Sequence, residues 1–298
     1  MADDSTGKVV TWDLEAVKPP LGHNPQVPWR SHASLAAGGA PEGDKVTDKC
    51  RVIVMRFGAN ANAMGNYHIH HHSDNLYYML QGTMTAIVGG TRFIVKAGEA
   101  IFMPRDVPHA TGNFGDEDVY LWEIYNPSTA RPEGNDSHPV ELPADIPDSK
   151  TNQENGVRIW DLKKLNPEFD PNKKDPWRIS RILAGGGNPA APDQVTDKTE
   201  VVLQRFAANA NTFGSYHVHH ESDNIWLVLE GTLSSIIGGK RYETKAGEVI
   251  FMPADVPHAT GNFTGEEMRA FEIYAPSTWV TGSHDSFPAE MPAEFAKH

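Results

Sequence analysis

The residues with the clearest chemical potential are histidines arranged in two similar sets. Each set has a His-x-His pair and a third histidine about 40 residues further along the chain. The six residues are His68, His70, His109, His217, His219 and His258. In a strand, residues i and i+2 point to the same face, and neutral imidazole is the commonest metal ligand. Each set therefore predicts a divalent transition-metal site with open coordination positions.

The duplication of this pattern favours a metal site over ordinary histidines. An isolated His-x-His pair is more often a core or surface feature whose ring nitrogens have hydrogen-bond partners. Here both third histidines lie in the same local sequence, DVPHATGNF, at 106–114 and 255–263. Three histidines repeated at one spacing in two copies are difficult to explain as chance surface residues.

The histidine sets belong to a repeat that spans most of the chain. Segments 46–130 and 195–279 align without a gap at an offset of 149, with about 50 identities in roughly 85 positions. Trp-Asp-Leu and Pro-Trp-Arg precede each copy at an offset of 148. A polar, proline-rich stretch at 127–156 is typical of a linker. We expect an N-terminal domain at 1–149 and a C-terminal domain at 150–298.

The elements that position the histidines are predicted to be short strands. Segments such as CRVIVMRF (50–57), NLYYMLQG (75–82) and DVYLWEIY (118–125) are rich in β-branched and aromatic residues and are bounded by turn residues. This pattern is typical of an antiparallel sandwich or barrel. A short helix is compatible only with WDLEAV (12–17) and WDLKKL (160–165).

The composition limits the classes of partner. The chain has 298 residues, with 26 Lys and Arg against 39 Asp and Glu, which gives a net charge of −13. Nucleic acid and anionic membranes select positive surfaces, so neither is expected as a partner.

No apolar run reaches the roughly 18–20 residues of a membrane helix, and no secretory signal is predicted. The single cysteine, Cys50, allows no intrachain disulfide, so we expect a cytoplasmic protein.

These residues resemble the cupin superfamily in its two-domain, bicupin form. The first cupin motif contains Gly, His-x-His, Glu and Gly, and the second contains Gly, Pro-x-Gly, His and Asn. The matching positions of the first copy are Gly65, His68, His70, Asn75, Gly82, Gly98, Pro104, Asp106, His109 and Asn113. Those of the second copy are Gly214, His217, His219, Asn224, Gly231, Gly247, Pro253, Asp255, His258 and Asn262. The resemblance implies an all-β fold of two tandem jelly-roll barrels, produced by duplication, each with a metal site at its mouth.

Asn75 and Asn224 stand where the cupin motif has a glutamate ligand. Three histidines without a carboxylate leave a divalent ion with a charge near +2 and up to three open positions. Such a site can chelate a bidentate anionic substrate beside O2. The two asparagines are either weak ligands or residues that orient a histidine.

Four further residues are candidates for the pocket walls. Alternation along the strand places Tyr77, and Trp226 in the second copy, on the same face as the asparagines. Each is a substrate contact or, as we favour for Tyr77, a core aromatic. Arg56 and Arg205 are candidate carboxylate clamps. We favour a structural role for them, as ion pairs with the glutamates of the repeated Glu-Ile-Tyr strand, Glu123 and Glu272.

The resemblance implies similarity to gentisate-type and diketone-cleaving dioxygenases. We therefore expect an Fe(II) dioxygenase, with one metal per domain, that uses O2 to cleave a small chelating aromatic diol, hydroxy-acid or diketone. Zn, Ni, Mn and Cu remain alternative metals. A redox-inert isomerase, decarboxylase or lyase acting on a small oxo-acid is a second prediction, and a non-enzymatic metal or small-ligand binding protein is a third. A homodimer is expected by analogy.

Overall fold

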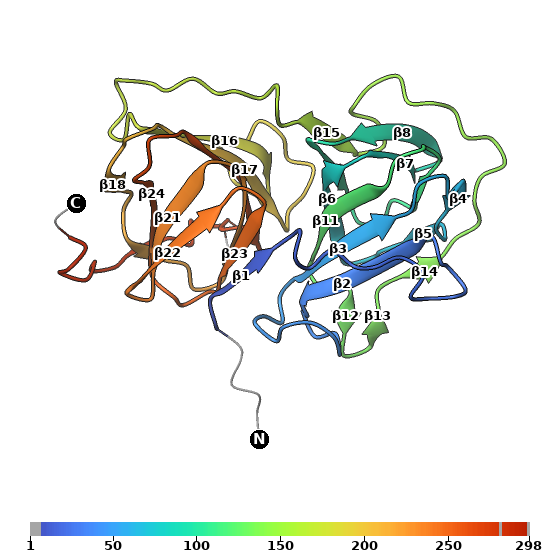
Figure 1. The fold of residues 1–298 in the computed structure, drawn as a ribbon, viewed down its shortest axis with the longest axis horizontal. Helices are drawn as coiled ribbons and strands as arrows, with labels where there is room; N and C mark the ends of the chain where they lie inside the picture. Colours follow the sequence, from blue (N-terminus) through green and yellow to red (C-terminus); the bar gives the residue numbers. More distant parts are fainter. Residues whose placement is uncertain (1–6, 280–281, 297–298) are drawn as a thin grey trace. The chain divides into compact units, whose positions relative to one another are not determined.

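The computed structural model describes residues 7–279 and 282–296 and divides the chain into two compact units. Unit 2 runs from Val17 to Asn166, and unit 1 joins residues up to Ala16 to residues from Pro167 onward. Both units are all-β, and no helix occurs among the described residues (Figure 1). The segments 12–17 and 160–165, for which a short helix was considered, contribute strands followed by turns instead.

Unit 2 consists of two facing antiparallel sheets. The first has the order β15 (Arg158–Asp161), β9 (Glu99–Met103), β6 (Asp74–Gln81), β11 (Val119–Asn126), β3 (Arg51–Phe57) and β2 (Arg30–Ala36). The second has the order β14 (His138–Pro139), β5 (His68–Ile69), β10 (His109–Asn113), β7 (Thr83–Val88) and β8 (Thr91–Lys96), with β4 (Ala63–Met64) beside β10. A small separate hairpin comprises β12 (Ala130–Arg131) and β13 (Gly134–Asn135).

Unit 1 repeats the two six-stranded sheets of unit 2 in the same strand order. Its first sheet has the order β1 (Val10–Asp13), β23 (Glu248–Met252), β20 (Asp223–Glu230), β25 (Met268–Ala275), β17 (Glu200–Phe206) and β16 (Arg178–Gly185). Its second has the order β22 (Lys240–Lys245), β21 (Thr232–Ile237), β24 (His258–Asn262), β19 (His217–Val218) and β26 (Phe287–Pro288), with β18 (Thr212–Phe213) beside β24.

The strand sequences explain these positions. Strand β11 is central in its sheet, and all eight of its residues are buried, in agreement with its continuous apolar and aromatic sequence. Strand β8 is an edge strand in which buried and exposed residues alternate. The β7–β8 hairpin turns at Gly89 and Gly90, where φ is +57° and +78°, values that favour glycine in a tight two-residue turn.

The leader strands exchange between the two copies of the repeat. Strand β1, which precedes the first copy in sequence, pairs with β23 of unit 1, and Figure 1 shows this blue strand beside the orange one. Strand β15, which precedes the second copy, pairs with β9 of unit 2. The compact units therefore differ from the contiguous halves expected at 1–149 and 150–298. The physical reason is that each leader completes the sheet edge of the other copy.

Candidate metal centre

The strand register brings distant histidines together. In unit 2, His68 of β5 pairs directly with His109, the first residue of β10. In unit 1, His217 of β19 pairs with His258 at the start of β24. Directly opposed residues of antiparallel strands have Cβ atoms about 4.5–5.5 Å apart. The two side chains are thus close enough for their rings to bind the same metal ion.

All six predicted histidines fall into two groups of three. In each group, one nitrogen of every ring lies within 4.8 Å of the others. The N-terminal triad, in unit 2, is His68, His70 and His109. The C-terminal triad, in unit 1, is His217, His219 and His258. Each triad combines a His-x-His pair with one residue from a neighbouring strand, as the sequence predicted.

Backbone carbonyls fix which ring nitrogen faces each site. His68 Nδ1 lies 2.8 Å from the Asn66 carbonyl oxygen, and His109 Nδ1 lies 3.1 Å from that of Val107. The C-terminal triad has the same contacts, His217 with Ser215 at 2.8 Å and His258 with Val256 at 3.1 Å. Since a carbonyl only accepts hydrogen bonds, Nδ1 carries the proton and the Nε2 lone pair remains available for a metal.

The second histidine of each His-x-His pair, His70 or His219, is held by a loop that is distant in sequence. His70 Nδ1 hydrogen-bonds the Asp136 carbonyl, and His219 Nδ1 hydrogen-bonds that of Asp285. The Asp136 carboxylate accepts hydrogen bonds from the backbone N–H groups of residues 71–73. Our sequence analysis missed these aspartates. The signal was present, because Asp-Ser-x-Pro recurs at 136–139 and 285–288 with the offset of 149.

The residues of both triads fit a divalent metal. The Nε2 atoms of His70 and His109 are buried without a hydrogen-bond partner. In the other triad, the Nε2 atoms of His217 and His219 lie 3.2 Å apart. A buried acceptor without a donor is costly, and so are two lone pairs that face each other. A cation bound by all three Nε2 atoms would satisfy them together.

Burial keeps the imidazoles in the form that binds metals. Desolvation lowers the pKa of His70 and of His219 to about 4 and that of His258 to about 3. The pKa of His109 is also well below its ordinary value, for the same reason. These rings are therefore neutral at pH 7, so no proton competes for the coordinating lone pairs.

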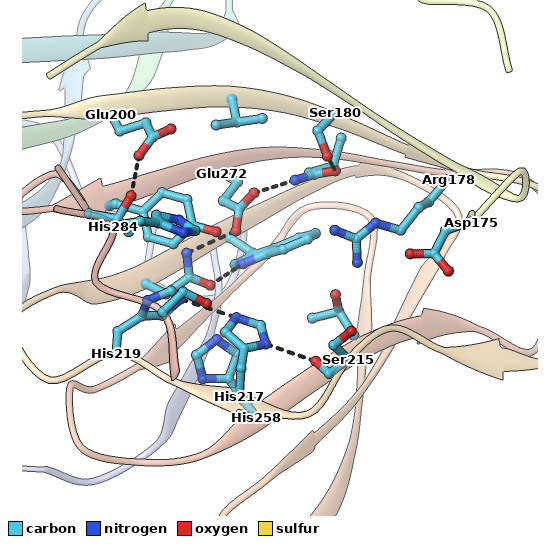
Figure 2. Close-up of a pocket in the computed structure, with 18 of the residues that line it drawn as sticks. Asp175, Arg178, Ser180, Glu200, Ser215, His217, His219, His258, Glu272 and His284 are labelled. Atoms are coloured by element: carbon cyan, nitrogen blue, oxygen red, sulfur yellow. Dashed lines mark hydrogen bonds between the residues drawn. The ribbon is translucent and has the colours of Figure 1, made fainter. Parts of the chain in front are cut away.

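The C-terminal triad opens into a cavity of about 450 Å³ inside unit 1. Figure 2 shows hydrogen bonds along one wall, centred on the buried carboxylate of Glu272. Asn224 Nδ2 donates to one carboxylate oxygen at 2.9 Å, and Gln204 Nε2 donates to the other at 2.5 Å. Ser180 donates its hydroxyl to Gln204 at 2.6 Å. The cavity thus combines a candidate metal centre with a fixed polar wall.

Arg178 supplies a positive charge on the same cavity. It lines the cavity with His217, whose pKa is lowered mainly by burial and further by the charge of Arg178. Figure 2 shows its guanidinium extending into the cavity, with Asp175 nearby. A Cβ built on Gly214 would lie 2.5 Å from Arg178 Nη1, so a larger residue there would displace the guanidinium from its present position. The motif glycine therefore has a local packing reason.

Comparison with known proteins agrees with this geometry. The sequence profile of the Cupin domain family matches residues 54–125 and 202–274. The chain contains two cupin domains. Salicylate 1,2-dioxygenase from Pseudaminobacter salicylatoxidans superposes on this bicupin with a TM-score of 0.71 at 14% identity, covering 92% of this chain and 86% of that one.

Two more solved structures have the same fold. A structure of salicylate 1,2-dioxygenase with gentisate gives a TM-score of 0.68 at 14% identity over 92% of this chain and 82% of that one. A cupin 2 conserved barrel domain protein from Leptotrichia buccalis gives 0.58 at 11% identity, over 89% and 96%. A search of curated protein sequences finds no match. No helix long and apolar enough to cross a membrane is present in the described part of the chain.

The asparagines of the bicupin motif contact glutamates rather than histidines. Asn75 Nδ2 donates to Glu123 at 3.0 Å, as Asn224 does to Glu272. The Asn224 side-chain oxygen also accepts a hydrogen bond from the indole of Trp226. Within the described residues, these contacts orient a buried carboxylate and an indole, and none of them orients a histidine as we had considered.

Arg56 and Arg205 form structural ion pairs, but with partners that we did not predict. Arg56 Nη2 lies 2.5 Å from an Asp118 carboxylate oxygen. Arg205 Nη2 lies 2.8 Å from Glu267. The predicted pairing with Glu123 and Glu272 is wrong because both glutamates are buried in the barrel interior and bond to asparagines instead.

Tyr77 and Trp226 occupy equivalent places but make different contacts. Both are 3% exposed. Each belongs to the buried core cluster of its own unit, and Trp226 also lines the cavity of unit 1. The arginine in the cavity, Arg178, was missed although Pro-Trp-Arg is repeated at 28–30 and 176–178.

Proposed function

We propose that this bicupin is a metal-dependent enzyme, and specifically an Fe(II) dioxygenase that cleaves a small chelating substrate with O2. The observation that carries the proposal is the C-terminal triad. It has three neutral histidines, no carboxylate among the grouped ligands and a solvent-connected cavity of about 450 Å³ in front of it. Open coordination positions are what simultaneous binding of substrate and O2 requires.

The likeness to salicylate 1,2-dioxygenase supports a hydroxylated aromatic acid as the substrate class. One structure of that enzyme contains gentisate. At 14% identity this likeness establishes the fold alone, so the substrate class depends on the cavity of this chain. Arg178 provides a cationic contact for a carboxylate, which would orient the substrate hydroxyl towards the triad.

The residues of the cavity have distinct roles in this proposal. Bound iron would supply Lewis acidity and one-electron chemistry with O2. The triad histidines hold neutral lone pairs in place, and Arg178 orients the acid group. Glu272 can accept a proton from the substrate hydroxyl, because burial raises the pKa of its carboxyl group. Trp226 and Phe206 cover the apolar side of the cavity and exclude water there.

The test is metal analysis followed by O2-uptake measurements. We expect iron in protein purified without added metal, and O2 consumption with gentisate, salicylate or a 1,3-diketone after anaerobic Fe(II) loading. Arg178→Met should raise KM for the acids and leave the diketone unaffected. Absence of O2 uptake with every metal tested would contradict the dioxygenase. Failure to bind any transition metal would favour a small-ligand binding protein instead.

One observation favours a second candidate, a redox-inert isomerase, decarboxylase or lyase. Glu272 and Glu200 are buried carboxylic acids on the cavity. Burial raises the pKa of the Glu272 carboxyl group, which suits it to the proton transfer at carbon that such reactions require. Turnover of an oxo-acid without O2 consumption, with Zn, Ni or Mn, would support this candidate. A cytoplasmic location and a homodimer belong to the proposal on sequence grounds alone.

A further inference from the structure

We propose that the two triads have separate tasks: the C-terminal triad receives the substrate, and the N-terminal triad holds a metal that exogenous ligands do not reach. This inference deepens the proposed function, because it states where the reaction of that function takes place. It depends on a comparison of the side chains that surround the two triads, whose histidines have nearly the same arrangement.

The walls of the two barrels differ at equivalent positions. In unit 1, Gln204 and Trp226 line the cavity together with Val202. Their counterparts at the offset of 149 are Met55, Tyr77 and Ile53. These three residues are 1%, 3% and 4% exposed and belong to one buried cluster. Exposure does not distinguish the two sets, because Val202, Gln204 and Trp226 are also buried, at 3%, 6% and 3%. The difference is one of chemistry: the polar Gln204, which borders the cavity, has the apolar Met55 as its counterpart in unit 2.

Tyr77 crosses the interior of unit 2. It lies on β6 of the first sheet, and its hydroxyl interacts with Glu123 of β11 and with Thr111 of β10, which belongs to the second sheet. Trp226 instead donates its indole N–H to Asn224, two residues away in the same strand. The tryptophan thus folds back on its own sheet, whereas the tyrosine connects the two sheets.

The histidines of the two triads are buried to a similar degree, at 2% and 1% for His70 and His109 and 3% for both His219 and His258, so the difference lies in the space in front of them. The Nε2 atoms of His70 and His109 are sealed from water and have no hydrogen-bond partner. All three residues of the C-terminal triad line the open cavity. An incoming ligand needs a path to the metal as well as a vacant coordination position. The cavity of unit 1 supplies such a path to the C-terminal triad.

The experiment counts ligand-accessible metals with 4-nitrocatechol, whose visible spectrum changes when it chelates a metal. Wild-type protein is loaded with Co(II), and the metal content is measured. We expect two metals per chain but only one bound 4-nitrocatechol. Two bound molecules of similar affinity would overturn the division of tasks. Fewer than two metals per chain would also overturn it, because the proposal requires both triads to be loaded.

Matched variants assign the accessible site. His70→Ala should bind one Co(II), in unit 1, and retain the spectral change. His219→Ala should bind one Co(II), in unit 2, and show no spectral change. The opposite assignment would contradict the proposal, because it would place the open metal in unit 2. Thermal unfolding of each variant establishes that both remain folded.

A third variant tests the cause of the closure. Tyr77→Ala in the His219→Ala background removes the side chain that crosses unit 2, and we expect the spectral change with 4-nitrocatechol to appear. If that variant fails to fold, the stoichiometry of the wild-type protein still decides the question. These experiments measure ligand binding and spectra rather than turnover. The division of tasks can therefore be contradicted while O2 uptake is observed, and it can be supported while no O2 uptake is found.

Discussion

The N-terminal and C-terminal triads are alike in their ligands and different in their surroundings. Both place two histidines on paired strands and hold the third through the carbonyl of an aspartate. The C-terminal triad lines a polar cavity, and in unit 2 the buried residues Met55 and Tyr77 stand at the positions of the cavity residues Gln204 and Trp226. The metal-binding motif therefore establishes what a cupin barrel can hold. In our proposal, the side chains on β3 and β6, or on β17 and β20, determine which molecules can reach the metal site.

The largest expected effect separates the two triads. His219→Ala should lower kcat/KM by about 1000-fold, since loss of a metal's charge stabilisation costs several kcal/mol at tenfold per 1.36 kcal/mol. His70→Ala should lower kcat/KM by less than tenfold and should lower Tm instead. Steady-state O2 uptake and calorimetry measure both. Equal losses of activity would remove the functional difference between the barrels.

A second prediction concerns the arginine of the repeated Pro-Trp-Arg motif in each unit. Arg178→Met should raise KM for an aromatic acid by about 10- to 100-fold, because charge-assisted hydrogen bonds contribute about 1.5–3 kcal/mol. Arg30→Met is the matched control in unit 2 and should change KM less than twofold. A similar effect of both substitutions would indicate that both barrels bind the acid.

A pH series tests whether the triads are as alike as their geometry indicates. In metal-free protein, the histidine pKa values of about 4 lie below the ordinary value of 6.5. Between these values the unfolded chain binds protons that the folded chain does not, so stability should fall as pH decreases from 6.5 towards 4 and stay level above 6.5. Thermal melts of apo His70→Ala and apo His219→Ala should each show a smaller fall than apo wild type, and by similar amounts.

The smallest expected effect concerns the exposed ion pairs. Asp118→Asn, which breaks the pair with Arg56, should cost less than about 1 kcal/mol because water screens partly exposed pairs. Glu267→Gln is the equivalent change at Arg205. Each should lower Tm by a few degrees at most and leave O2 uptake unchanged. A large loss of activity from either substitution would indicate that Arg56 or Arg205 contacts the substrate after all.

Most of the fold could be predicted because the repeat and its motifs are local. Strand lengths, turn glycines and the His-x-His spacing depend on neighbouring residues, and the structure agrees with them. The strand exchange could not be predicted in this way. Strands β1 and β15, VTWD and RIWD, share the Trp-Asp of the repeated motif, and this motif does not indicate which copy each strand completes.

The walls of the site were harder to predict than the ligands. Asp285 and Arg178 are far in sequence from the histidines that they hold or face. Arg205 was assigned to the wrong carboxylate because alternation along a strand gives its face but not its depth in the barrel. Tyr77 and Trp226 share a position, yet their different polar atoms send them to different partners. Such choices depend on the whole interior.

The exchange of leader strands has a consequence for the order in which the chain folds during synthesis. Unit 2 is complete once Asn166 has left the ribosome. Strand β1 is made before it but pairs with residues Glu248 to Phe251. At about 5–20 residues per second, β1 waits roughly 10–50 s for that partner. Strand β1, the first strand among the described residues, is thus among the last to be paired, and its edge hydrogen-bonding groups lack their β23 partner for that time.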